Sequence, residues 1–328
     1  MVYIRLPHEE ERRLSFYLAM EEYIAREVDV RDAFFIWQVL PSVIFGRNQL
    51  IESEVNIDYC RRNEVKMYRR KSGGGCVYAD KSNMMLSFVT SSDHVCLTYN
   101  RYIMLVVDAL HKIGVPATAN GRNDVMIEGR KVSGNAFYHI PGRSIVHGTM
   151  LYDTNMRNMT ACITPDDEKL LSKGVKSVRQ HIALLKDYTT LTIDEVKKSI
   201  IESVCDSTMT LTDDDVAKIE EIEKEYLTDE FIYGNNPKYT VIRKQRIEKV
   251  GTVEVRMEVK NDTIRDIDLK GDFFLIGDID TIRTPLKGVS LSRDAIIAAL
   301  PENIGEIIMN LGRDDLAGVI LRRKADER

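Results

Sequence analysis

Long apolar runs, secretory signals and a Lys/Arg excess are all missing from this 328-residue sequence. Apolar stretches such as residues 34–37 are far shorter than the about 20 residues that a membrane-spanning helix needs, so we expect no membrane partner. The first residues show neither an apolar signal core nor an Arg-rich amphipathic leader. We therefore expect a cytoplasmic protein.

Cysteine motifs are also missing. The five cysteines are odd in number and far apart, without a Cys-x-x-Cys pair or a histidine at zinc-ligand spacing: Cys60, Cys76, Cys96, Cys162 and Cys205. This usage is typical of free thiols in a reducing compartment.

Charge is nearly balanced, with 46 Lys and Arg against 51 Asp and Glu, a net charge of −5. This balance argues against a nucleic-acid partner, whose phosphates select basic surfaces. Hydrophobic residues make up 44% and charged residues 30%, as in globular proteins, and the length suggests two domains. Acidic residues concentrate in 205–230, where a solvated helix face is the ordinary interpretation.

Periodicity and capping signals give a coarse outline. Helices are expected over 14–24 and after two caps, Thr192 with Glu195 and Thr212 with Asp213–Asp215. Strands are expected over 33–39 and 42–45.

The C-terminal part differs in pattern. Residues 252–260 alternate between apolar and polar, Asn261-Asp262 is a two-residue turn, and the return strand continues through Leu269. A helix follows the cap Ser292. We expect a catalytic domain over 1–245 and a small accessory domain over 246–328.

The segment 65–80 is the most informative. A short apolar strand leads into Arg69, Arg70 and Lys71, and then into three glycines. Consecutive glycines let the backbone approach a ligand and present N–H donors to anionic oxygens. The spacing matches neither the P-loop nor the dinucleotide fingerprint. A glycine-rich hairpin with solvated bases remains the alternative.

Two further segments carry candidate residues. Residues 123–136 predict a hairpin with Gly129-Arg130 as its turn and Lys131 leading the return strand. By itself, Lys131 is most simply a surface lysine. Residues 144–152 predict a strand that contains His147, which by itself is most simply a satisfied core histidine.

Together these segments resemble the lipoate–protein ligases. The family pattern R-R-x-S-G-G-G-x-V-x-x-D-x-x-N is present at 69–83, N-D-φ-x-x-x-G-(R/K)-K-φ-S-G-x-A at 123–136, H-G-T-φ-L at 147–151 and K-S-V-R at 176–179. The resemblance implies an α+β catalytic domain, with a mixed sheet and flanking helices, related to biotin ligases and class II aminoacyl-tRNA synthetases. It also implies a small C-terminal α+β accessory domain.

The implied reaction joins lipoate and ATP into lipoyl-AMP and then acylates a lysine of an acceptor protein. The resemblance makes Lys131 the catalytic residue and Asp124 the group that positions Mg²⁺ on the phosphates. Besides Lys131, the implied ATP-binding residues are Arg70, Gly75, Cys76, Val77, Tyr78 and Asn83, and the implied lipoate-binding residues are Ser72, Gly74 and His147. An apolar slot for the dithiolane tail is expected near Phe35, Val43 and Phe45.

The implied acceptors are apo lipoyl domains of 2-oxo-acid dehydrogenase acyltransferase subunits and the glycine cleavage H protein, and we expect a monomer. One alternative is an octanoyl- or lipoyl-transferase, which uses a cysteine nucleophile and no ATP, although residues 113–121 ahead of the Gly129 turn contain no cysteine. Another is a non-catalytic paralogue that binds nucleotide or lipoyl domains. Ala79 and Ser82 depart from the His and Gly of many relatives and keep that alternative open.

Overall fold

The computed structural model describes the chain except residues 92–94, 121–122, 164–181, 234–240, 261 and 323–328, so the expected K-S-V-R segment lies outside the described residues. The described residues form one eight-stranded and two three-stranded sheets with flanking helices. This is the mixed α+β class that was expected. In the described part, no helix has the length and apolar character needed to cross a membrane.

The chain divides into two compact units. The larger contains Met1–Phe45, Ile51–Arg70 and Cys76–Tyr233, and the smaller contains Gly46–Leu50, Lys71–Gly75 and Gly234–Arg328. The smaller unit thus begins ahead of the boundary expected at 245 and includes two loops from the N-terminal half. The sequence pattern did not indicate that these two loops belong with the C-terminal residues, and the domain limits at 245 and 246 stay a prediction.

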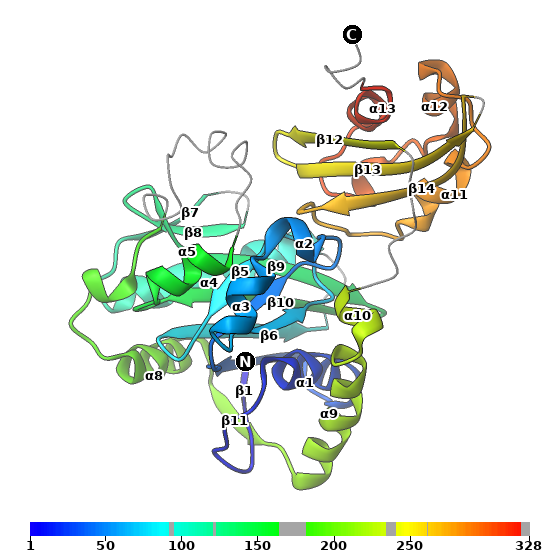
Figure 1. Ribbon diagram of the computed structural model, residues 1–328. Helices are drawn as coiled ribbons and strands as arrows, with labels where there is room; N and C mark the ends of the chain where they lie inside the picture. The colour runs from blue at the N-terminus through cyan, green and yellow to red at the C-terminus, as the bar shows by residue number, and fades with distance from the viewer. Residues whose placement is uncertain (92–94, 121–122, 164–181, 234–240, 261, 323–328) are drawn as a thin grey trace. The chain divides into compact units, whose positions relative to one another are not determined.

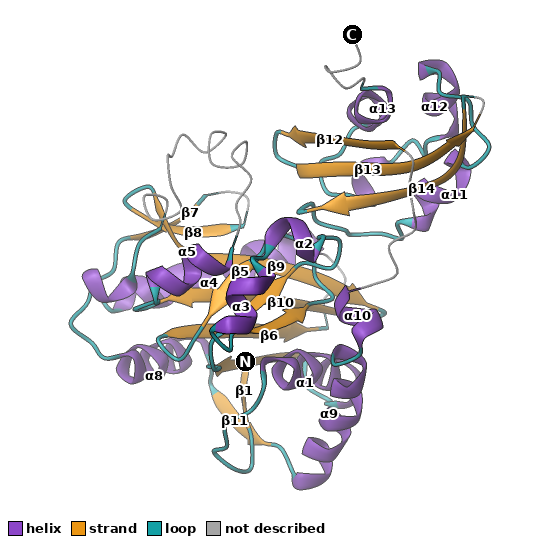
Figure 2. Cartoon of the chain, in the orientation of Figure 1, coloured by secondary structure: helices purple, strands orange, loops and turns teal. Residues whose placement is uncertain are grey.

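The large sheet has the strand order β11-β1-β2-β6-β10-β9-β8-β7 (Figures 1 and 2). Strands β11, β1 and β2 are parallel, and every pairing from β2 to β7 is antiparallel. The strands are β1 (Val2–Arg5), β2 (Asp32–Trp37), β6 (Asn83–Thr90), β7 (Ala117–Ala119), β8 (Asp124–Ile127), β9 (Arg130–Ile140), β10 (Arg143–Leu151) and β11 (Ser207–Thr210).

Helices cover both faces of this sheet. Tyr138 of β9 belongs to the core that α1 (Leu14–Glu27) and α9 (Asp213–Tyr226) share. Its neighbour Phe137 instead lies against Tyr99 of α4 (Val95–Lys112), with ring centroids 5.4 Å apart. Because successive strand residues point to opposite faces, α1 and α4 lie on opposite faces. Helix α8 (Ile193–Val204) packs beside α4.

A second core in the larger unit surrounds the small sheet β4-β3-β5. Its members include Val43, Phe45 and Tyr78, all fully or nearly fully buried. The elements around it are β3 (Ser42–Phe45), β4 (Lys66–Arg69), β5 (Val77–Ala79), α2 (Ile51–Glu54), α3 (Ile57–Arg62), α5 (Met156–Cys162), η1 (Leu185–Asp187) and α10 (Asp229–Tyr233).

The smaller unit is an antiparallel sheet with helices around its own core. Its elements are β12 (Val241–Ile247), β13 (Gly251–Lys260), β14 (Thr263–Gly271), α11 (Asp280–Leu286), α12 (Arg293–Ala299), η2 (Ile304–Glu306) and α13 (Arg313–Leu321). The two loops join it through backbone hydrogen bonds: Gly271 N–H donates to the carbonyl of Asn48 (2.7 Å), and Gly74 N–H donates to that of Phe273 (3.4 Å).

The local sequence signals are confirmed. The hairpin expected from residue 252 onward is β13 and β14, and Ser292, Thr192 and Thr212 cap α12, α8 and α9. The strands expected over 33–39 and 42–45 are β2 and β3, but they belong to different sheets. Periodicity describes a strand's faces and not its partner, so the sequence could not show this separation.

The cap of α8 can be tested by Thr192→Ala. Thr192 Oγ1 accepts a hydrogen bond from the N–H of Glu195 (3.3 Å), and the Glu195 carboxylate accepts one from the N–H of Thr192 (2.7 Å). Losing such a cap costs about 1 kcal/mol. We expect denaturant unfolding of Thr192→Ala to show this loss. Thr190→Ala, two residues away and exposed, is the matched control and should stay within about 0.5 kcal/mol of the wild type.

Candidate active site

An ion pair between Lys131 and Asp124 lies at the centre of the candidate site. Lys131 Nζ is 2.7 Å from Asp124 Oδ1, with the lysine side chain 22% exposed and the carboxylate 7% exposed. The lysine crosses directly over Gly134, where a Cβ would lie 2.4 Å from Nζ. Glycine at 134 is therefore required for this position of the lysine.

The hairpin of β8 and β9 holds this pair. Asp124 is opposite Gly134, and a bulge after Val125 brings Met126 opposite Lys131. The turn residues are Glu128 and Gly129, with φ of 50° and 75°, so the turn lies one residue ahead of the expected Gly129-Arg130. Lys131 is the second residue of β9, within the return strand as expected.

His147 belongs to a buried hydrogen-bonded chain on the α1 face of the large sheet. Its Nδ1 lies 2.8 Å from the carboxylate of Glu21, which is fully buried in α1. Ser87 Oγ donates to the same carboxylate (2.5 Å), and Trp37 Nε1 donates to Ser87 Oγ (2.9 Å). The sequence pattern indicated His147 but not the other three members of this chain, Glu21, Ser87 and Trp37. An acidic residue on an otherwise apolar helix face was the available signal.

The basic segment Arg69–Lys71 does not form an exposed patch, because both of its arginines are buried. Arg69 Nε donates to the carbonyl of Ile232 (2.9 Å), and its guanidinium lies over the ring of Phe45 (4.6 Å). Arg70 is 5% exposed and donates to the carbonyl of Ile44 (3.2 Å). Burial lowers the pKa of Arg70 to about 10, while Coulombic interaction with Cys76 and Glu21 acts in the opposite direction. Arg70 thus shares the buried electrostatic surroundings of Glu21.

The glycine triplet is packed within the smaller unit. A Cβ on Gly73 would lie 2.5 Å from the carbonyl oxygen of Phe273, and the N–H of Gly74 donates to that oxygen. The carbonyl of Ser72 accepts from the N–H of Arg47 (2.9 Å). Glycine is therefore needed at position 73 at least in part because the backbone of Phe273 approaches it so closely.

The other expected nucleotide residues differ in their surroundings. Cys76 is half-buried and Val77 lies in β5, where it pairs with β3. Tyr78 is buried, its hydroxyl accepts from Asn158 Nδ2 (3.3 Å), and burial raises its pKa. Asn83 is 1% exposed; its Nδ2 donates to Thr154, and its Oδ1 has no hydrogen-bond partner among the described residues.

Ala79 and Ser82, the two departures from the family pattern, lie in different surroundings. Ala79 is fully buried in the core beneath α1. Ser82 donates to Asp80 Oδ1 from both its N–H (3.0 Å) and its hydroxyl (2.7 Å), and the N–H of Asn155 reaches Asp80 Oδ2 (3.2 Å). Asp80 therefore connects these segments.

The expected apolar slot is divided between two cores. Phe35 lies with Trp37 in the core on the α1 face, whereas Val43 and Phe45 lie in the core of the small sheet. Only Phe35 shares a core with a member of the His147 chain.

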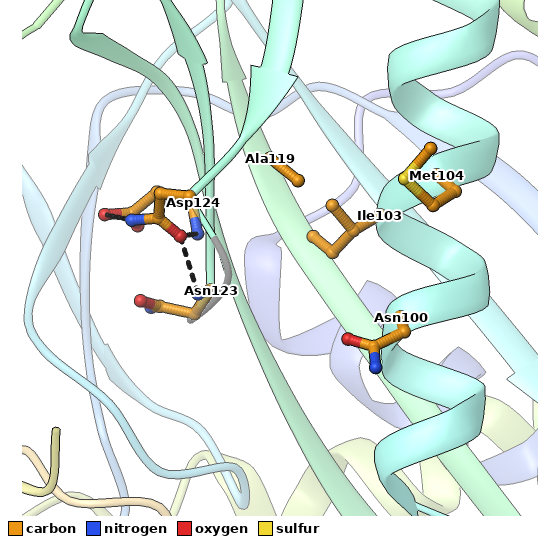
Figure 3. Close-up of a pocket in the computed structure, with 7 residues that line it drawn as sticks. Asn100, Ile103, Met104, Ala119, Asn123 and Asp124 are labelled. Atoms are coloured by element: carbon orange, nitrogen blue, oxygen red, sulfur yellow. Dashed lines mark hydrogen bonds between the residues drawn. The ribbon is translucent and has the colours of Figure 1, made fainter.

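A small pocket opens between α4 and the start of β8, with about 430 Å³ of open space. Figure 3 shows Ile103 and Met104 of α4 on one side, with Asn123 and Asp124 on the other. The lining also includes Asn100, Ala119 and Asn120. It lies beside the strand that carries Asp124.

Two family models match the chain. The model of the lipoyl protein ligase A/B catalytic domain matches residues 14–205, and that of the bacterial lipoate protein ligase C-terminus matches 236–320.

Proteins similar to this chain are named as lipoate–protein ligases. Lipoate-protein ligase LplJ of Bacillus subtilis is 32% identical over 316 residues, covering 92% of this chain and 95% of its own. A structure of P. falciparum LipL1 in complex with lipoate has a TM-score of 0.80 at 18% identity, covering 98% of this chain and 99% of its own, which supports the fold. A lipoate-protein ligase A bound with ATP has a TM-score of 0.62 at 26% identity, covering 71% of this chain and 98% of its own. The chain belongs to the lipoate–protein ligase family.

Proposed function

We propose that this ligase uses Lys131 to activate lipoate with ATP and then passes the lipoyl group to a lysine of a lipoyl domain. The observation that carries the assignment is the Lys131–Asp124 ion pair over Gly134. It holds a cation at a defined point of the sheet. Family membership supplies the reaction, and the proposal concerns which residues perform it.

In the first step, a carboxylate oxygen of lipoate attacks the α-phosphorus of ATP. The new bond is O–P, the bond to the β-phosphate oxygen breaks, and pyrophosphate leaves. Both reactants are anions, so a fixed cation between them stabilises the charge of the transition state. Lys131 is that cation, and Asp124 holds its ammonium group in place.

In the second step, the neutral ε-amine of the acceptor lysine attacks the carbonyl of lipoyl-AMP. The C–N bond forms, the amine loses a proton, and AMP leaves with the electrons of the C–O bond. Lys131 stabilises the departing phosphate by the same electrostatic effect.

The residues that we propose to bind the nucleotide are Arg70, Gly75, Cys76, Val77, Tyr78, Asn83 and Lys131. The buried Oδ1 of Asn83, for which the described part of the chain offers no hydrogen-bond partner, supports a role toward adenine, whose exocyclic amine is a hydrogen-bond donor. Because the hydroxyl of Tyr78 is already bonded, its contribution is through the backbone.

The residues that we propose to bind lipoate are Ser72, Gly74, His147 and Lys131. His147 lies on the same face of the sheet as Trp37 and Phe35, which are apolar and buried. This arrangement supports a slot on the α1 face in which the dithiolane tail meets aromatic walls.

Mg²⁺ fits this site through the phosphates. The described residues contain no cluster of three or more His, Cys, Asp or Glu side chains that could hold a metal alone. Mg²⁺ commonly uses one or two carboxylates with phosphate oxygens, and Asp124 is a buried carboxylate beside the proposed phosphate site. When bound, the metal would neutralise phosphate charge, while Asp124 would orient both it and Lys131.

The proposed acceptors are lipoyl domains of 2-oxo-acid dehydrogenase complexes and the glycine cleavage H protein, with the ligase acting as a cytoplasmic monomer. Four thiols are free in the described part of the chain, and Cys60 and Cys162 among them are fully buried. A transferase mechanism needs a nucleophilic thiolate that the acyl group can reach, which burial disfavours at those two positions.

Lys131→Met tests the catalytic assignment. This variant keeps most of the side-chain length and removes the charge, so lipoate-dependent ATP–pyrophosphate exchange should fall by about 10²–10³-fold. The exchange is measured with lipoate, ATP and Mg²⁺ and without acceptor protein. Lys198→Met, on an exposed position of α8, is the matched control and should retain wild-type exchange.

Two results would reverse the assignment: exchange that survives Lys131→Met, or ATP-independent acyl transfer that a single Cys→Ser change abolishes. Replacing each of the five cysteines by Ser should leave exchange intact, because the proposed path contains no thioester.

Asp124→Asn tests the metal role. We expect a higher Mg²⁺ concentration for half-maximal exchange and a slower maximal rate, since the amide lacks the charge that both Mg²⁺ and Lys131 need. Exchange is titrated with Mg²⁺ at saturating ATP. Asp187→Asn, on an exposed position of η1, is the control. An unchanged Mg²⁺ dependence would contradict the metal role and would mean that Asp124 only orients Lys131.

A further inference from the structure

Asn135 of β9 connects two segments around the candidate site. Its N–H and its side-chain Nδ2 both donate to the carbonyl of Asn123, each at 3.0 Å. In return, Asn123 Nδ2 donates to the carbonyl of Asn135 (3.2 Å). We call these three hydrogen bonds the Asn123–Asn135 clamp.

The clamp acts next to the ion pair but on the other side of the sheet. Asn135 follows Gly134, and successive strand residues point to opposite faces, so its side chain lies on the face away from Lys131. It is 3% exposed. It therefore cannot contact substrates on the Lys131 face.

Glycine in β10 makes room for this carboxamide. A Cβ on Gly148 would lie 1.8 Å from Asn135 Oδ1. The same Oδ1 accepts a hydrogen bond from the hydroxyl of Ser133 (3.2 Å). Its conformation is thus restricted by Gly148 of the neighbouring strand β10 and by Ser133 of its own strand.

The position of Asp124 depends on what holds the start of β8. Asp124 is the first residue of this four-residue strand, and Asn123 before it lies outside the strand. Asn120 holds Asp124 from one side, because its Oδ1 accepts from the N–H of Asp124 (3.0 Å) and its Nδ2 donates to the carboxylate (3.2 Å). The clamp attaches the preceding residue, Asn123, to β9 directly beside Gly134, over which Lys131 lies.

We propose that Asn135 is a positioning residue for the ligase reaction: through Asn123 it fixes Asp124, and through Asp124 it fixes the ammonium group of Lys131. This proposal rests on the function proposed above, because it assigns Asn135 a role in the same activation step. It also gives a physical reason for Gly148, whose missing side chain leaves space for the carboxamide of Asn135.

A double-mutant cycle with Asp124→Asn tests the proposal. In the wild-type background, Asn135→Ala should lower the kcat of lipoate-dependent ATP–pyrophosphate exchange about 10-fold, because displacing a catalytic group by a fraction of an ångström costs that much or more. The KM values for ATP and lipoate should change less than about 2-fold. In the Asp124→Asn background the same change should cost less than about 2-fold, since the route through Asp124 is already broken.

A purely structural role would give a different result. Lost packing alone would reduce exchange by the same factor in both backgrounds, and such additive losses would overturn the proposal, as would an unchanged kcat for Asn135→Ala. If wild-type protein shows no exchange at all, the proposed function fails instead, so the two failures are distinguishable.

Two companion variants keep the test decisive. Tyr99→Phe removes the hydroxyl that donates to the carbonyl of Asn135 (3.2 Å) and leaves the clamp in place, so its exchange should match the wild type. Asn123→Ala removes the one clamp hydrogen bond that the Asn123 side chain donates, to the carbonyl of Asn135, and serves where Asn135→Ala does not fold, as thermal melting will show. It should reproduce the loss of kcat and its dependence on Asp124, and wild-type exchange by Asn123→Ala would refute the clamp.

Discussion

The rest of the site depends on one ion pair, in which Lys131 lies across Gly134 and contacts the carboxylate of Asp124. Lys131 and Asp124 are seven residues apart, and their 2.7 Å contact exists only because β8 and β9 pair in one register. A slip of one residue would place the two side chains on opposite faces of the sheet. The left-handed turn residues, Glu128 and Gly129, and the bulge after Val125 fix that register.

The same face of the sheet carries a second charged group, and its burial explains the polar residues around it. Glu21 is fully buried, and an uncompensated carboxylate there would cost several kcal/mol. Ser87 donates a hydrogen bond to it and His147 lies in contact with it. Arg70 contributes positive charge nearby. These residues come from four separate segments, so the carboxylate links α1 to the strands and holds His147 in one orientation.

The glycine triplet shows how one sequence feature can satisfy two physical needs. Glycines suit a loop that presents N–H groups to phosphates, which is the role proposed for Gly75 and the residues after it. Gly73 is also needed because the backbone of Phe273 approaches it, and Gly74 has a φ of 86° and donates to the same residue. A loop in the N-terminal half thereby belongs to the unit formed by the C-terminal residues.

The sequence by itself determined the features that depend on neighbours along the chain. Caps at Thr192 and Thr212, the hairpin from residue 252 and the position of Lys131 in a return strand all follow from local spacing, which acts within a few residues. Four motifs in fixed order were sufficient to identify the family. The partners of His147, the separation of β2 and β3 into two sheets, the burial of Arg69 and the clamp around Asn135 were decided only by the tertiary structure. Each of these features depends on strand pairing or on contacts between segments that are distant along the chain. Packing in three dimensions selects those partners, and a one-dimensional pattern does not encode that packing.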